Sequence, residues 1–307
     1  MSYPAAAAAC VLAVGALWAA AGKKQIPPAK TTLLCCCAAV GGFLLAKAGY
    51  LCFYAREQWM RWGIRALVLC RTGTFSFAGG MAGAVAGLAL GARWTRVRLA
   101  DTLDGFAPWG ALLTAAFRLL EYLLGTVGAG TMLAEGHWAA GTILAVRNAW
   151  GEWFWAVCLW EAAYALAVMA LSFRRGRWYG TLAALCAGQV FFEVLRSNTI
   201  SWHFIRLDQL WCAAILLAMA LREAIACPEG GLVRRGGRVL LAAAMIGLNA
   251  WAQFVLDKPY LLTDLLPASA REAVLAHLRP VCLGMAALSA VGLGLSVIRQ
   301  RGYTRRP

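Results

Sequence analysis

The sequence predicts an all-α protein, a polytopic transmembrane helical bundle of about nine helices, with seven in a main domain and two in a C-terminal extension. Two observations lead to this class. Hydrophobic residues make up 62% of the 307 residues and charged residues only 14%, whereas a soluble domain carries roughly 25% charged residues. The apolar residues also gather in stretches close to the roughly 20 residues that cross a bilayer. Lipid is therefore expected to cover most of the outer surface.

The predicted spans follow one another along the whole chain. They are residues 4–21, 33–54, 76–92, 105–125, 153–172, 179–195, 207–226, 239–256 and 280–298. The apolar segment 62–70 is too short to cross a bilayer, and we expect it to lie at the membrane interface with part of 126–150. A stretch rich in Gly and Arg, 227–237, predicts a loop before the last two spans, which hold few ionisable residues. We therefore predict a membrane domain over 1–226 and a two-helix extension over 227–307.

The net charge of +15 does not indicate a nucleic-acid partner, because the Lys and Arg residues fall in short clusters between apolar stretches. Under the positive-inside rule their distribution places the N-terminus outside and the C-terminus in the cytoplasm, although the outer loop 55–75 is more basic than the rule favours. The apolar N-terminal segment is followed, not preceded, by basic residues at Lys23, Lys24 and Lys30. This order predicts a retained helix rather than a cleaved signal peptide.

The cysteines do not predict disulfides or a metal site. Ten of the 11 lie in or beside apolar stretches, and Cys227 lies near a helix end. The sequence has no CxxC pair and no Cys/His spacing typical of metal ligands, so we interpret the cysteines as small hydrophobic residues. It also has no Gly-rich phosphate loop, no His-Glu-x-x-His and no G-x-S-x-G motif. We therefore predict neither a metal nor a cofactor.

Small residues mark one helix face. Gly79, Gly83 and Gly87 recur every fourth residue within the span 76–92. In a membrane such a face lets a second helix approach closely, and we expect Gly83 and Gly87 to serve packing alone.

Ionisable side chains inside the spans are the first candidates for function, because each costs roughly 2.5 kcal/mol or more in a bilayer. They are Lys47, Arg118, Glu121, Glu161 and Glu193, with Arg196 at a helix end and Asp104 at the edge of a span. Arg118 and Glu121 are three residues apart and share a helix face, as do Glu193 and Arg196. Two interpretations stay open: these pairs hold helices together, or they line a polar cavity that binds an anionic headgroup through arginine.

Six short motifs follow one another between residues 33 and 220. They are Gly49-Tyr50 after Lys47, Thr74–Gly83 (TFSFAGGMAG), Leu103–Pro108 (LDGFAP) with Arg118 ten residues later, Leu159–Glu161 (LWE), Phe192–Arg196 (FEVLR) and Asp208–Leu210 (DQL). In order and spacing they resemble motifs of the prolipoprotein diacylglyceryl transferases of bacterial membranes, among them M-S-F-H-G-G-L-x-G, L-D-x-x-A-P and V-E-F-F-R. The shared order of the six motifs indicates the fold of that family.

The resemblance implies transfer of a diacylglyceryl group from phosphatidylglycerol to the cysteine thiol of a prolipoprotein, with glycerol phosphate as the leaving group. It also implies a place in the bacterial cytoplasmic membrane, with phosphatidylglycerol and the prolipoprotein signal peptide as partners. The expected catalytic residues are Arg118, Glu121 and Glu193. The expected substrate-binding residues are Lys47, Tyr50, Gly79, Gly80, Glu161, Gln189 and Arg196.

The sequence departs from the family pattern where protons would be transferred. Where the family has its signature His, this chain has Ala78. Where the family has an Asn three residues after its Arg, this chain has Glu121. Four residues before Glu193, where the family has an Arg, this chain has Gln189. The phosphate-binding half of the pattern is thus partly kept and the proton-transfer half mostly lost. Glu121 serves either as a replacement base or as the partner of Arg118 in a simple ion pair, and both interpretations stay open.

Three functions fit these residues. The first is an active, divergent diacylglyceryl transferase. The second is a catalytically inactive relative that binds anionic lipid or lipoprotein precursors as a membrane scaffold, which the missing His favours. The third, a small-solute transporter or channel, is disfavoured because the sequence shows no inverted repeat and no broken helix pair. His137 and His203 lie in outer segments and are further candidates to act on a thiol at the membrane surface, although loop histidines are usually solvated. The sequence carries no signal for an oligomeric state.

Overall fold

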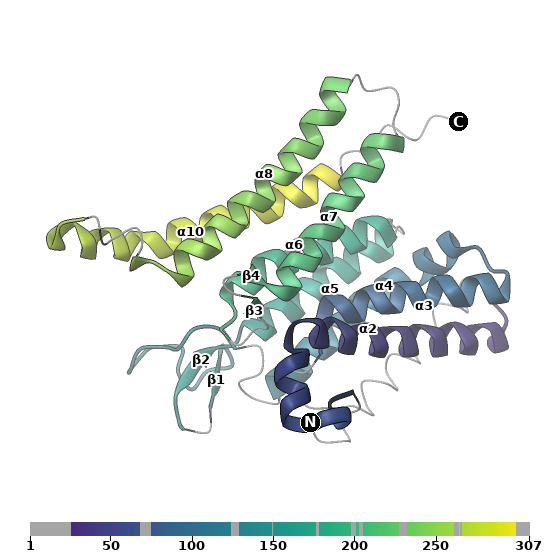
Figure 1. The fold of residues 1–307 in the computed structure, drawn as a ribbon, viewed down its shortest axis with the longest axis horizontal. Helices are drawn as coiled ribbons and strands as arrows, with labels where there is room; N and C mark the ends of the chain where they lie inside the picture. Colours follow the sequence, from purple (N-terminus) through teal and green to yellow (C-terminus); the bar gives the residue numbers. More distant parts are fainter. Residues whose placement is uncertain are drawn as a thin grey trace. The chain divides into compact units, whose positions relative to one another are not determined.

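The computed structural model describes residues 26–67, 75–123, 129–148, 150–175, 178–197, 201–202, 205–226, 232–260, 264 and 266–298. Within these ranges the fold is all-helical apart from two short hairpins, with eight α-helices and one 3-10 helix (Figure 1). The predicted all-α class is confirmed. The chain divides into two compact units, Met1–Leu185 with Leu195–Ile200, and Cys186–Val194 with Ser201–Pro307.

The first unit holds most of the helices. They are α2 (Pro28–Trp62), the 3-10 helix η1 (Gly63–Leu67), α3 (Phe77–Thr95), α4 (Leu99–Leu123), α5 (Val157–Arg175) and the first part of α6 (Trp178–Leu195). Strands β1 (Ala145–Arg147) and β2 (Trp153–Trp155) pair in antiparallel fashion, with Val146 opposite Phe154. Figure 1 shows α2 and α3 side by side.

The second unit begins within α6 and contains the C-terminal helices. Its elements are β3 (Ser201–Trp202), β4 (Ile205–Arg206), α7 (Leu207–Ala226), α8 (Leu232–Asp257) and α10 (Ala268–Ile298). The two strands form a minimal antiparallel pair in which Trp202 lies opposite Ile205. Helices α8 and α10 pack against each other, as Figure 1 shows in green and yellow.

Within the described part of the chain, four helices are long and apolar enough to cross a membrane. Their apolar segments are Pro28–Cys52, Trp178–Leu195, Gly236–Asp257 and Ala270–Gly294. A shorter apolar helix covers Val157–Phe173. Helices also occupy the spans predicted at 76–92, 105–125 and 207–226. The span predicted at 4–21 lies outside the described residues.

The predicted span 153–172 starts too early, because its first residues are strand rather than helix. Trp153–Trp155 form β2, and α5 begins only at Val157. Aromatic residues fit a pleated, half-buried surface well. Gly151, with a φ of 88°, lies in the turn that precedes the strand, and this left-handed backbone favours glycine.

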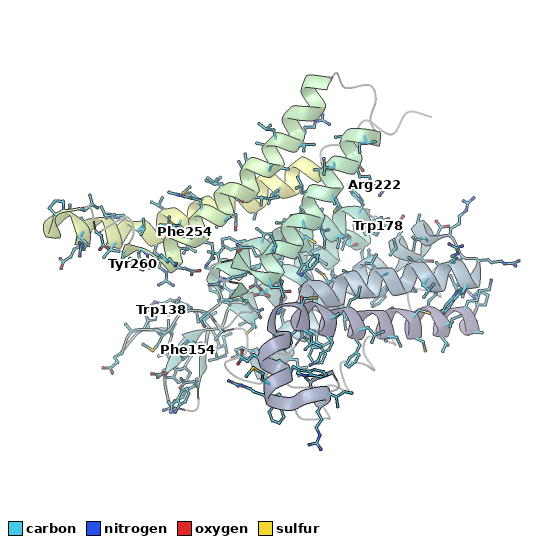
Figure 2. The ribbon with its side chains drawn as sticks, in the orientation of Figure 1. Trp138, Phe154, Trp178, Arg222, Phe254 and Tyr260 are labelled. Atoms are coloured by element: carbon cyan, nitrogen blue, oxygen red, sulfur yellow. The ribbon has the colours of Figure 1, made fainter. Side chains whose placement is uncertain are left out.

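The segment between α4 and α5, predicted to be partly interfacial, contains the β1–β2 hairpin and several exposed aromatic side chains. Trp138 and Trp150 are 69% and 86% exposed. Figure 2 labels Trp138 and Phe154 on this segment. Exposed tryptophans are typical of the boundary between a bilayer and water, and the interfacial position stays a prediction.

The predicted loop 227–237 is too long, because α8 already begins at Leu232. Gly236 and Gly237 lie inside the helix, although an internal Gly costs about 1 kcal/mol relative to Ala. Helix growth is cooperative, and the long apolar stretch that follows outweighs this local cost. In the short apolar segment 62–70, Trp62 is the last residue of α2 and Gly63–Leu67 form η1, while residues 68–70 lie outside the described residues.

Helices α2 and α3 pack along a seam of glycines. A Cβ added at Gly83 would overlap the carbonyl oxygen of Gly41, and a Cβ added at Gly87 would overlap the carbonyl oxygen of Cys37. Only glycine at these positions lets the two backbones approach so closely, which is a common way for helices to associate in membranes. The packing role predicted for Gly83 and Gly87 is confirmed.

Helix α8 carries a row of polar side chains on one face, Asn249, Gln253 and Asp257. Gln209 of α7 donates a hydrogen bond to Asn249 Oδ1, and Gln253 Nε2 donates to Asp257 Oδ1 at 2.8 Å. Asn249 and Gln253 are 2% and 1% exposed. The predicted extension is therefore joined to α7 by a buried polar contact as well as by apolar packing.

Replacing Gly87 by Ala is expected to lower the stability of the first unit by about 1–3 kcal/mol, the usual cost of overpacking. The added methyl group would meet the Cys37 carbonyl. Gly180→Ala in α6 is the matched control, because a Cβ there meets nothing within 4 Å among the described residues. Thermal unfolding of the purified protein in detergent compares the two variants. Equal unfolding midpoints would contradict the glycine seam.

Candidate functional site

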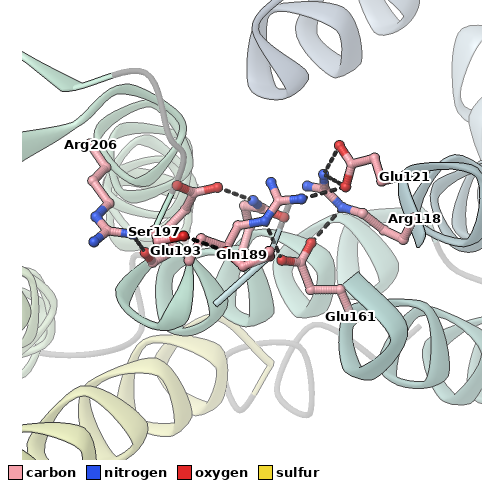
Figure 3. Close-up of polar contacts among 9 residues, drawn as sticks. Arg118, Glu121, Glu161, Gln189, Glu193, Ser197 and Arg206 are labelled. Carbon is pink, nitrogen blue, oxygen red and sulfur yellow. Dashed lines mark hydrogen bonds and ion pairs between the residues drawn. The ribbon is translucent and has the colours of Figure 1, made fainter. Parts of the chain in front are cut away.

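Four charged side chains of the first unit meet in a closed arrangement, here named the four-charge ring. It consists of Arg118 and Glu121 of α4, Glu161 of α5, and Arg196 directly after α6 (Figure 3). Each arginine contacts both glutamates. Arg118 Nη1 lies 2.9 Å from Glu121 Oε2, and Arg196 Nε lies 2.9 Å from Glu161 Oε1. Arg118 Nε also pairs with Glu161 Oε2, and Arg196 Nη2 with Glu121 Oε2.

Burial is uneven around the ring. The side chains of Arg118, Glu161 and Arg196 are 2%, 3% and 7% exposed, whereas that of Glu121 is 24% exposed. An isolated charge at such depth would be very costly, so buried charges are paired. Two positive and two negative groups leave the ring with no net formal charge. Glu121 is the member of the ring that reaches the surface of the unit.

Arg118 is held by its surroundings as well as by its ion pairs. Its guanidinium carbon lies 4.4 Å from the centroid of the Phe77 ring. Phe77 is the first residue of α3, and the N-cap Ser76 accepts a hydrogen bond from the Gly79 N–H at 3.0 Å. This cap fixes the start of α3, and stacking of the cation on the aromatic face then restricts the plane of the guanidinium.

Arg196 lies where α6 ends, and its neighbour anchors the chain. The N–H and the hydroxyl of Ser197 donate to the Ala129 carbonyl oxygen at 2.9 Å and 3.1 Å. Glu161 stands one turn into α5. Three segments that are distant in the sequence, around residues 118, 161 and 196, therefore contribute to one site.

Lys47 and Tyr50, both predicted to bind substrate, lie near the start of α3. Lys47 is 6% exposed, and its Nζ lies 5.6 Å from the centroid of the Tyr50 ring and 5.2 Å from that of Phe75. Gln58 donates to the Tyr50 hydroxyl at 2.9 Å. Phe75 and Phe77 are two residues apart. The segment 75–77 therefore places one aromatic ring against Lys47 and another against Arg118 of the ring.

Gly79 and Gly80, also predicted to bind substrate, lie on the glycine seam. A Cβ at Gly79 would come within 2.5 Å of the Leu45 carbonyl oxygen, and a Cβ at Gly80 would lie 3.5 Å from Ala46 Cβ. Their immediate neighbours are therefore residues of α2. A contact with substrate at these positions stays a prediction.

Gln189 and Glu193 belong to the second unit. Gln189 Nε2 donates to Glu193 Oε1 at 2.6 Å, and Arg206 donates to the Glu193 backbone carbonyl. Gln189 and Glu193 are 5% and 1% exposed. The expected catalytic role of Glu193 and the expected substrate-binding role of Gln189 remain predictions, and their buried amide–carboxylate contact is consistent with a structural role.

Two contacts of the first unit are missed by reasoning from sequence. Phe77 carries no charge, so nothing in the sequence marks it as the platform for Arg118. Asp104 is noticed only as an acid at the edge of a span, yet its Oδ1 accepts a hydrogen bond from the Trp178 N–H at 2.8 Å. Asp104 of α4 thus caps the start of α6. The first N–H groups of a helix lack partners within the helix, and this need for an acceptor is what could have indicated a capping role for Asp104.

The remaining sequence candidates have simpler surroundings. The His137 ring lies 5.5 Å from that of Trp138 and 5.3 Å from that of Trp155, centroid to centroid. Its Nδ1 accepts a hydrogen bond from the Ala139 N–H at 3.2 Å. His137 is therefore part of an aromatic cluster on the hairpin segment. His203 lies outside the described residues.

No protein-family model matches the sequence, and comparison with curated proteins finds no significant match. The assignment of a function therefore depends on the ring, on its burial and on the order of the sequence motifs.

Glu161→Gln is expected to lower the free energy of unfolding by about 3–5 kcal/mol, because it leaves two buried guanidiniums short of a carboxylate. Glu57→Gln is the control. Glu57 pairs with Arg61 at 3.1 Å, but the two side chains are 50% and 67% exposed, and such pairs contribute about 0–1 kcal/mol. Chemical unfolding in detergent measures both variants. If Glu161→Gln proved as mild as Glu57→Gln, the ring would not be a stabilising network.

Proposed function

We propose that this protein is a divergent prolipoprotein diacylglyceryl transferase of the bacterial cytoplasmic membrane, with its N-terminus outside and its C-terminus in the cytoplasm. The observation that carries the proposal is the meeting of Arg118, Glu161 and Arg196 in one buried ring. These residues come from three separate motifs of the family pattern. A chance likeness of motifs would give no reason for them to share a site.

The chemistry of the ring suits a lipid phosphate. Arginine presents a planar fork that matches phosphate oxygens, and it keeps its charge at any physiological pH. In surroundings that exclude water, such donors stabilise charge that develops in a transition state far better than they do in water. The burial of Arg118, Glu161 and Arg196 among the apolar helices of the first unit provides such surroundings.

The proposed reaction forms one bond and breaks one bond. The thiolate of the prolipoprotein cysteine is the nucleophile, and its sulfur attacks the glyceryl carbon that carries the phosphate ester. The carbon–oxygen bond breaks, and its electron pair leaves with glycerol phosphate, which the arginines stabilise. The thiol proton passes to a carboxylate. Glu121 is the most exposed carboxylate of the ring and is the proposed acceptor, because the family's His is replaced by Ala78.

An inactive lipid-binding relative is the second candidate, and two observations favour it. Both arginines of the ring already have carboxylate partners, and Ala78 is 1% exposed with no group that could move a proton. A relative of this kind would retain phosphatidylglycerol through purification but release no glycerol phosphate when given a lipobox peptide.

Arg118→Ala is expected to abolish transfer, a loss of about 100-fold or more in rate, because one charge that stabilises the leaving phosphate is gone. Release of glycerol phosphate from phosphatidylglycerol in the presence of a lipobox peptide measures the reaction. Arg147→Ala is the matched control, since Arg147 also stacks on an aromatic ring, 5.7 Å from the centroid of Trp153, but lies on the exposed hairpin. Unchanged release by Arg118→Ala would refute the transferase, and no release by the unaltered protein would favour the inactive relative.

A further inference from the structure

The four-charge ring leaves no unpaired charge for a phosphate. Its two arginines are matched by two carboxylates, so a phosphodiester that simply joined it would place three negative groups against two positive ones. At three corners of the ring the side chains are at most 7% exposed. An unbalanced charge at such depth is strongly unfavourable. A ligand phosphate must therefore take the place of a carboxylate.

The two glutamates hold the arginines by different atoms. Glu161 uses one oxygen for Arg118 Nε and the other for Arg196 Nε. Glu121 instead accepts from the outer nitrogens, Nη1 of Arg118 and Nη2 of Arg196. Both Glu121 oxygens lie 2.9 Å from Arg118 Nη1. Glu161 is thus the inner brace of the two guanidiniums, and Glu121 occupies their outer ends.

Exposure points to the same glutamate. The Glu121 side chain is 24% exposed and the Glu161 side chain 3%. The Glu121 carboxylate can leave the arginines without crossing the interior, whereas the Glu161 carboxylate would have to carry its charge out of it. Carboxylates and phosphates are both oxyanions that arginine binds through paired N–H donors, so the place that Glu121 leaves already fits a phosphate.

We propose that the Glu121 carboxylate is an internal substitute for the lipid phosphate, and that the phosphate binds by displacing it from Arg118 and Arg196. This inference rests on the proposed function. One negative group replaces another, so the ring remains neutral while Glu161 continues to brace both arginines. The displaced Glu121 is then a free carboxylate beside the bound ester, and it accepts the thiol proton as the carbon–oxygen bond breaks. The carboxylate that pairs with the arginines in the resting ring becomes the base of the reaction only when substrate is bound.

Glu121→Gln separates the two roles of this residue. Removing the competing charge is expected to tighten binding of short-chain phosphatidylglycerol to the full-length protein in detergent by about tenfold or more, since a charge-assisted contact no longer has to be broken. Release of glycerol phosphate is expected to fall in the same variant, because its proton acceptor is lost. Glu57→Gln, which removes a surface glutamate from its pair with Arg61, is expected to change neither quantity.

Binding is measured by calorimetry with two probes, short-chain phosphatidylglycerol and glycerol phosphate. Tighter binding of both by Glu121→Gln supports displacement by the phosphate alone, and tighter binding of the lipid only supports displacement by the lipid headgroup. Glu121→Ala provides a second test, and thermal unfolding verifies that both variants are folded. Equal or weaker binding by both folded variants overturns the displacement. That result leaves the transferase standing, because the transferase is judged by glycerol phosphate release from the unaltered protein.

Discussion

The need of two buried arginines for counter-charges organises the first unit. A guanidinium cannot escape its charge by losing a proton in a protein, so it must be paired or remain near water. Arg118 and Arg196 solve this together, by sharing Glu121 and Glu161. The ring closes only when α4, α5 and the end of α6 are at the correct heights and rotations. A neutral group of four charges thereby sets the relative placement of segments that apolar packing alone would leave free to slide.

Much of the architecture could be predicted from the sequence. Long apolar stretches predict α2, α6, α8 and α10 as candidate spans, because length and hydropathy are local properties. The contact between Arg118 and Glu121 follows from their spacing of three residues on one helix, and it is present at 2.9 Å. The glycine seam follows in the same way from the regular spacing of Gly83 and Gly87. In each case the residues from which the feature is predicted lie on a single helix.

Relations between elements could not be predicted. Spacing within a helix gives no information on whether Glu161 of one segment meets Arg196 of another, and burial of both depends on how three helices rotate. The role of Phe77 is hidden because an aromatic residue in an apolar stretch is ordinarily core. Strand β2 was obscured for a related reason, since a run of aromatic residues such as Trp153–Trp155 has the hydropathy of a span and the shape preference of a strand.

The polar row on α8 has a consequence for how the C-terminal half is made. If α8 crossed a bilayer alone, the Asn249 amide would lose its partner on α7, and an amide without a partner is costly in hydrocarbon. Gln253 keeps its partner, because it donates to Asp257 within α8 itself. Gln209, which donates to Asn249, lies in α7 and is synthesised earlier. The partner of Asn249 is therefore already made when α8 is synthesised. The contact between the two amides favours the rotation of α8 that turns Asn249 toward α7.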